Sequence, residues 1–250
     1  MIDSHCHLDV AAFDADRDAM IARAVAAGVT GMLVPAIRPA TWPGLRALAS
    51  RHPQLRFAIG VHPQLVPEEI SFHPDALARA ADGAVAIGET GLDGETPDME
   101  AQIAAFRTHI RAARARRLPL VVHVLRAHDL APQILREEQA HEVGGVLHSY
   151  SGGAALVPIY RDLGFAFGIA GPITYPNARR PVEAALAMPD ELLLIETDSP
   201  DQAPEGHRGG RNEPAFLPAV CAALAAVRGR SVHDMAALTT ANACRIFGAF

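Results

Sequence analysis

Short apolar segments rich in branched side chains alternate with longer alanine-rich segments along the whole chain. This alternation is typical of parallel strands that are joined by helices. The expected strands are Ile2–Leu8, Gly31–Ala36, Arg56–Val61, Ala84–Glu89, Leu120–Val124, Gly145–His148, Phe165–Ala170 and Leu192–Thr197. The expected helices lie near Asp16–Ala27, Thr41–Arg51, Asp75–Ala81, Met99–Arg117, Leu130–Glu138, Ala154–Asp162, Pro181–Ala187 and Pro214–Val227. Eight strands that alternate with eight helices predict an α/β fold, a TIM-like (β/α)8 barrel.

A further helix is expected near Ser231–Ala241, with Ser231 as its N-cap, as an addition at the C-terminus. No repeat, low-complexity tract or linker divides the 250 residues, a length that such barrels fill as one domain. We therefore expect a single domain over residues 1–250. The sequence resembles neither a signal peptide nor a membrane span, and its three cysteines form no paired pattern. These features predict a cytoplasmic protein without a membrane partner, as a monomer or small oligomer.

The charge of the chain limits its possible partners and chemistry. The formal net charge is −6, so the chain lacks the basic surface that long nucleic-acid duplexes require. All 22 basic residues are arginine, which excludes a Schiff-base lysine and a carbamylated lysine between two metals. A role on nucleic acid would be local, at an end or a short strand, with metal ions supplying the positive charge.

Histidines and carboxylates follow the apolar runs of several expected strands. Barrel enzymes carry their chemistry at the C-terminal ends of the strands, where these side chains would meet. His5 and His7 stand two residues apart, a spacing that directs both rings to one face of a strand, and Cys6 to the other. We interpret Cys6 as a buried hydrophobe rather than a metal ligand. The remaining strand-end residues are His62, Glu89, His123, His148 and Asp198.

A single histidine or carboxylate at a strand end is usually an ordinary capping or loop residue. Several histidines and carboxylates at one barrel mouth would be costly in desolvation and repulsion, and metal ions would relieve that cost. Nitrogen and oxygen ligands suit zinc, manganese, iron or magnesium. With His62 set apart, four histidines and two carboxylates exceed the needs of one catalytic metal, so we expect two divalent ions. Glu89 is the expected bridge, since no lysine can take that role.

Ordered motifs give the chain a family resemblance. The segments HCH at 5–7, GETGLD at 88–93, VVH at 121–123, HSYSG at 148–152, ETDSP at 196–200, RNEP at 211–214 and NACRIF at 242–247 resemble the TatD family of metal-dependent hydrolases. The segments RAHD at 126–129, GPITYP at 171–176 and DSPD at 198–201 resemble its YjjV-like subgroup. The resemblance covers essentially the whole chain.

The resemblance implies a TIM-like barrel of the amidohydrolase superfamily with a dinuclear site. It implies that one metal is held by His5, His7 and Asp198, the other by His123 and His148, with Glu89 between them. The chain departs from the family pattern at Leu125, where an arginine is common, at Gly94 after GLD, and at Gln64 in the HPH pattern. These departures concern the substrate pocket and not the expected ligands.

These inferences predict a hydrolase in which metal-activated water attacks phosphorus or a carbonyl carbon. Asp198 and Glu89 are the expected catalytic residues, with Asp198 accepting the proton of the water and passing it to the leaving group. The expected activity is that of a phosphodiesterase or deoxyribonuclease on DNA ends or short single strands. The alternatives are hydrolysis of a small ester or amide, or of an aminoacyl ester, and a barrel that binds without catalysis.

Several residues beside the expected site are candidate substrate contacts, each with a plainer interpretation as well. Arg126, Arg208 and Arg211 can hold phosphate oxygens or be ordinary surface charge. His62 can contact substrate or hydrogen-bond a neighbouring loop. Asp93 can contact a metal ligand from behind, contact substrate or form a turn. Tyr150 can stack on a base or pack beneath its own glycine-rich loop. The expected substrate contacts are His62, Asp93, Arg126 and Arg211.

Overall fold

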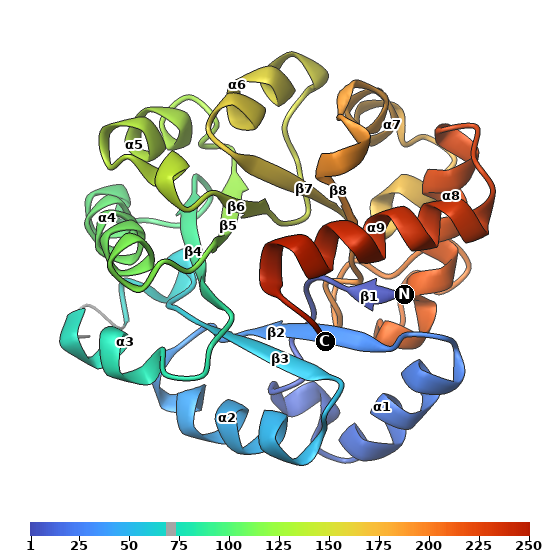
Figure 1. Ribbon diagram of the computed structural model, residues 1–250, viewed down its shortest axis with the longest axis horizontal. Coiled ribbons are helices and arrows are strands. Elements are labelled where there is room, and N and C mark those ends of the chain that lie inside the picture. Colours follow the sequence, from blue (N-terminus) through green and yellow to red (C-terminus); the bar gives the residue numbers. More distant parts are fainter. Residues whose placement is uncertain (69–73) are drawn as a thin grey trace.

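Eight parallel strands form one nearly closed barrel in a computed structural model that describes residues 1–68 and 74–250 (Figure 1). The strands are paired in chain order: β1 Ile2–Asp3, β2 Gly31–Pro35, β3 Leu55–Ile59, β4 Ala86–Asp93, β5 Leu120–Leu125, β6 Gly145–Leu147, β7 Phe165–Ile169 and β8 Leu193–Ile195. The first strand also lies beside the last, because the N–H of Ser4 donates to the carbonyl of Ile195 over 3.1 Å. The predicted TIM-like fold is confirmed.

Helices surround the barrel between the strands (Figure 1). They are α1 Arg17–Ala26, α2 Trp42–Arg51, α3 Pro74–Ala80, α4 Met99–Arg116, α5 Ala131–Glu137, α6 Val157–Asp162, α7 Arg179–Ala187, α8 Leu217–Val227 and α9 Val232–Phe247. The segments Ala154–Leu156 and Pro214–Phe216 form 3₁₀ turns, so α6 and α8 begin three residues later than predicted. Among the described residues no single helix is long and apolar enough to cross a membrane, although α8 with its preceding turn and α9 meet that criterion as a pair bent by 107°.

The additional C-terminal helix α9 covers the end of the barrel at which the strands begin (Figure 1). Asn242 fixes it there by donating to the carbonyls of Asp190 (2.7 Å) and Leu193 (2.9 Å), at the start of β8. The hydroxyl of Ser231 caps the helix by accepting the N–H of Asp234, as predicted, but the helix continues to Phe247 rather than ending at Ala241. The opposite end of the barrel is left for polar side chains.

The interior of the barrel is packed with small and branched residues. Each strand contributes one residue to the same buried cluster: Ile2, Leu33, Ala58, Ala86, Val121, Val146, Ala166 and Leu194. Ala243 and Phe247 of α9 complete the cluster. Neighbouring strand residues point outward to the helices because side chains alternate between the two faces of a strand. This packed floor makes the barrel a rigid base for the side chains above it.

Two strands differ from the sequence prediction by more than two residues near the polar end. Strand β1 ends at Asp3 rather than at Leu8, and the extended segment that follows keeps backbone bonds to Leu33 on one side and to Ile195 and Ser199 on the other. Strand β4 does not end at Glu89 but continues to Asp93, with a shift in its register against β5 between Ile87 and Thr90. Both deviations affect how the polar side chains are presented.

Candidate metal centre

His5 and His7 lie in an extended segment between β2 and β8. Backbone bonds hold it on both sides: Cys6 N–H donates to Leu33 (3.0 Å), and His7 N–H donates to Ser199 (2.8 Å). The extended backbone directs both imidazoles to the same side, with their Nε2 atoms 3.1 Å apart. Cys6 is fully buried on the other side within the outer core, as expected of a small hydrophobe.

Glu89 lies at the centre of the polar end and is completely buried. The register shift in β4 lies at this position, so the carboxylate is presented inside the barrel mouth. Two residues further, Gly91 has φ +140°, and a Cβ there would overlap the backbone carbonyl of His123. Glycine at 91 is therefore what allows β4 and β5 to approach each other beside the site.

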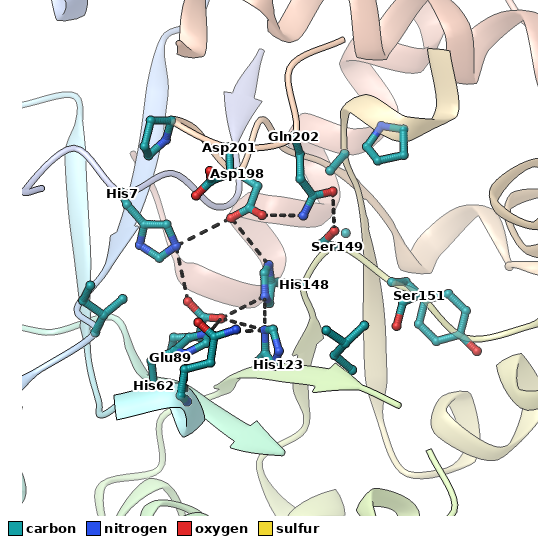
Figure 2. Close-up of a pocket in the computed structure, with 18 of the residues that line it drawn as sticks. His7, His62, Glu89, His123, His148, Ser149, Ser151, Asp198, Asp201 and Gln202 are labelled. Atoms are coloured by element: carbon teal, nitrogen blue, oxygen red, sulfur yellow. Dashed lines mark hydrogen bonds and ion pairs between the residues drawn. The ribbon is translucent and has the colours of Figure 1, made fainter. Parts of the chain in front are cut away.

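One carboxylate oxygen of Glu89 faces the N-terminal histidines. Its Oε2 lies 3.2 Å from His5 Nε2 and 3.4 Å from His7 Nε2. Asp198 approaches the same nitrogens from the loop after β8, with Oδ1 at 3.6 Å from each (Figure 2). These side chains surround one point with two nitrogen and two oxygen atoms.

The other oxygen of Glu89 faces a second set of histidines. Its Oε1 lies 2.8 Å from His148 Nε2, 3.1 Å from His62 Nε2 and 3.3 Å from His123 Nδ1 (Figure 2). His123 Nδ1 is also within 3.1 Å of His148 Nε2 and 3.3 Å of His62 Nε2. His62, expected at the substrate, thus lies among the expected metal ligands.

The donor atoms of the site are poorly satisfied by one another. Both oxygens of Glu89 are buried without a partner of hydrogen-bond geometry, as are Nδ1 of His5 and of His148 and Nε2 of His123. Buried polar atoms are normally bonded, and a bare cluster of this kind is costly. Three groups of side chains can converge on a cation: His5, His148 and Asp198; His5, His7 and Glu89; and His62, Glu89 and His123. The residues fit divalent ions, whose positive charge would satisfy the two oxygens of Glu89. The three unpartnered ring nitrogens lie on the opposite side of each imidazole from the nitrogen that faces Glu89.

Electrostatics keep the two acidic groups ionised despite their burial. Burial acts to raise the pKa of Glu89, but the charges of His62, His148 and His5 hold it well below its usual range. Burial likewise opposes the shift at Asp198, whose pKa the neighbouring His7 imidazole and the charge of His148 lower to about 2. The reciprocal effect of Asp198 and Glu89 raises the pKa of His7 to about 9. The ionised carboxylates thus favour positive charge at this end of the barrel.

Asp93 lies behind His123. Its Oδ2 is 3.3 Å from His123 Nε2 and accepts the side-chain amide of Gln64 at 2.8 Å. Its Oδ1 accepts the N–H of Glu95 at 2.8 Å, a turn-type contact. Asp93 is fully buried and does not line the pocket, so it lies behind His123 and outside the pocket wall.

A second set of polar contacts fixes Asp198 and His148. The amide of Gln202 donates to Asp198 Oδ2, and its carbonyl oxygen accepts the hydroxyl of Ser149 at 2.8 Å (Figure 2). Glu196 accepts the N–H of Ser149 and lies 3.7 Å from His148 Nδ1. Neither Gln202 nor Glu196 is among the site residues expected from the sequence, although Glu196 belongs to the ETDSP motif.

A cavity of about 870 Å³ opens above the centre. Its walls are largely apolar, from segments after β1 to β3 on one side and after β5 to β7 on the other. Tyr150 lines it but is only 7% exposed, with its hydroxyl donating to Gly153 (3.1 Å) and its ring 5.0 Å from Phe167. Tyr150 therefore packs beneath its own loop, the plainer of its two interpretations.

None of the arginines considered as phosphate contacts lines this cavity. Each has a carboxylate partner of its own: Arg126 with Glu95 at 2.9 Å, Arg211 with Asp16 at 2.7 Å and Arg208 with Glu205 at 3.7 Å. The arginines that do line the cavity are Arg38 and Arg180. The structure therefore does not bring Arg126 and Arg211 to the site, because local acids hold them elsewhere.

Comparison with known proteins identifies the family. The model of the family "TatD related DNase" matches residues 2–248. The metal-dependent hydrolase YcfH of Escherichia coli is 35% identical over 252 residues, which cover 99% of this chain and 95% of that protein. The crystal structure of YjjV, a TatD homologue from Escherichia coli, has a TM-score of 0.94 at 31% identity and covers 100% of this chain and 98% of the other. The chain therefore belongs to the TatD family of metal-dependent hydrolases.

Proposed function

We propose that the protein is a phosphodiesterase that uses two divalent cations at the barrel mouth. The observation that carries the proposal is the division of ligands between the two oxygens of Glu89. Oε2 faces His5 and His7, whereas Oε1 faces the histidines of β5 and β6. A carboxylate that faces two sets of ligands in this way suits a bridge between two ions, the arrangement used by many phosphoryl-transfer enzymes.

The ligand sets follow from this division. His5, His7 and Asp198 would hold one ion, and His123 and His148 the second, with Glu89 shared between them. His62 Nε2 lies 3.1 Å from Glu89 Oε1 and is available to the second ion as well as to substrate. The donor chemistry suits zinc, manganese, iron or magnesium.

The chain's own residues define the proton path. Bound divalent ions would supply Lewis acidity, which activates water and stabilises charge on the attacked oxygen. Asp198 Oδ1 points toward His5 and His7, where it would contact the first ion, and Gln202 donates to Oδ2, so this carboxylate would lie beside the activated water and accept its proton. Asp198 then returns that proton to the leaving group. Asp93 and Glu196 keep His123 and His148 in orientation throughout.

We further propose DNA ends or short single strands as substrates, in the cytoplasm. The support is the family description together with a net charge of −6, which disfavours an extended duplex. One observation favours a small ester, amide or aminoacyl ester instead. The cavity walls are mainly apolar, as in pockets that bury small molecules.

Parallel hydrolysis assays separate these substrates. Purified protein is incubated with Mg²⁺, Mn²⁺ or Zn²⁺ and a labelled single-stranded oligonucleotide, an aryl phosphodiester or an aryl ester. We expect chelator-sensitive cleavage of the oligonucleotide, and ester-only turnover would favour the second substrate class. Asp198→Asn and Glu89→Gln should each lower the rate by about 10²-fold or more, while the surface variant Asp162→Asn should not. Folded Asp198→Asn and Glu89→Gln variants with wild-type rates would contradict the mechanism.

A further inference from the structure

Arg180 is a cation at the pocket wall without a counter-ion among the residues that the structure describes. It is the second residue of α7, it is exposed, and it lines the cavity. No hydrogen bond or ion pair joins its guanidinium to any residue that the structure describes. The other pocket arginine, Arg38, has Glu68 at 3.9 Å. Arg180 is thus the pocket-lining arginine in the described part of the chain whose charge is not neutralised.

The position of Arg180 in its helix is unfavourable for folding. Helix α7 begins with Arg179 and Arg180, has no acidic residue in its first turn, and receives no side-chain cap from Ala178. The positive end of the helix dipole disfavours cations at this place and favours anions. Two arginines there raise the positive potential without a stabilising contact, a cost that an anion in the pocket would offset.

The surroundings of Arg180 leave its guanidinium available to an anion. Ile173 and Pro181, which line the same cavity, are apolar and offer it no side-chain partner. Its charge also reaches Tyr150, whose pKa burial raises to about 12 against the opposing effect of Arg180. Tyr150 and Ser151 belong to the loop directly after His148, which joins this wall to the metal centre.

We propose that Arg180 forms an anion subsite that binds a second negatively charged group of the substrate, separate from the bond that is hydrolysed. The inference rests on the proposed hydrolase function of the same pocket. The group is a phosphate or a carboxylate, because the planar guanidinium offers paired donors to both. A substrate with a charged group at each end of a small apolar body fits the cavity.

Matched substrates and neighbouring arginines test the subsite. One substrate pair is thymidine 5′-(4-nitrophenyl phosphate) with and without a 3′-phosphate, and the other is 4-nitrophenyl hemisuccinate beside 4-nitrophenyl acetate. The variants are Arg180→Met and, as control, Arg179→Met, which removes the adjacent charge outside the pocket lining. Calorimetry measures binding of thymidine 3′,5′-bisphosphate and thymidine 5′-phosphate to the same proteins, independently of turnover.

We expect the additional anion to lower KM about tenfold in the wild type and in Arg179→Met, with kcat within about twofold. Arg180→Met should lose this preference in turnover and in binding. The substrate pair that shows the effect identifies phosphate or carboxylate as the group. Turnover without any preference for the additional anion, or equal effects of the two variants, would overturn the subsite and leave the hydrolase proposal intact. Absence of all turnover would overturn the hydrolase proposal, and calorimetry would then decide the subsite alone.

Discussion

Replacing Asp93 with asparagine tests how the fold orients an expected metal ligand. Asp93 Oδ2 faces two donors, His123 Nε2 at 3.3 Å and Gln64 Nε2 at 2.8 Å, while Oδ1 accepts the N–H of Glu95 at 2.8 Å. Asparagine can keep the bond from Glu95 only by turning its own NH₂ toward the two donors. The opposite orientation keeps the bond from Gln64 and the contact with His123, and gives up the bond from Glu95.

The expected cost follows from the hydrogen bonds that asparagine cannot accept. A hydrogen bond to a buried charged group is worth about 1.5–3 kcal/mol, and asparagine gives up at least one in either orientation. Partners behind a ligating histidine typically change metal affinity by about 10- to 100-fold when mutated. We therefore expect Asp93→Asn to weaken divalent-ion binding by about tenfold or more.

The matched control is Glu95→Gln, which removes one negative charge from the same loop without a contact to His123. Glu95 is half-exposed and pairs with Arg126 at the surface. Competitive titration of chelator-treated protein with Zn²⁺ measures both affinities, and thermal unfolding confirms that both variants fold. Zn²⁺ affinities of Asp93→Asn and Glu95→Gln that agree within about twofold would refute the claim that Asp93 orients His123.

Two further predictions concern proton transfer and stability. Gln202→Leu removes the donor that fixes Asp198 Oδ2, so kcat should fall about tenfold with KM little changed. The surface variant Gln133→Leu should keep both constants. A wild-type kcat in Gln202→Leu would contradict this role. Burial lowers the pKa of His109 from 6.5 to about 4, so the unfolded chain binds a proton at this imidazole more tightly than the folded chain does. About 3 kcal/mol of folding stability is therefore present above pH 6.5 and is lost as the pH falls toward 4. His109→Gln should flatten the pH dependence of urea unfolding in that window relative to the exposed-residue control His141→Gln, and an unchanged slope would show that His109 does not cause it.

The alternation of apolar segments was sufficient to predict the barrel, because each strand must bury one face inward and one face outward. The residues at which the strands end were less predictable. His5 and His7 were expected on a strand, but β1 ends at Asp3. Their rings nevertheless meet, since the extended backbone that follows keeps the two-residue period. The periodicity of side chains, and not membership of a strand, brings these ligands together.

Tertiary effects account for what the sequence did not predict. The register shift that accompanies Glu89 depends on how β4 pairs with β5, a contact between distant segments. Arg211 was expected at the substrate, but an acid from the first loop, Asp16, holds it at 2.7 Å. Gln202 carries no sequence signal of its own, and only the position of Asp198 gives its amide a role.

Counting bound metal ions tests the central claim most directly, that Glu89 joins two sets of ligands. Protein prepared without chelators and dialysed against metal-free buffer is analysed by inductively coupled plasma mass spectrometry, as wild type and as Glu89→Gln. The account predicts about two divalent ions per wild-type chain and loss of at least one of them in Glu89→Gln. A wild type that holds no more than one ion after this treatment, or a Glu89→Gln variant that retains two, would contradict it.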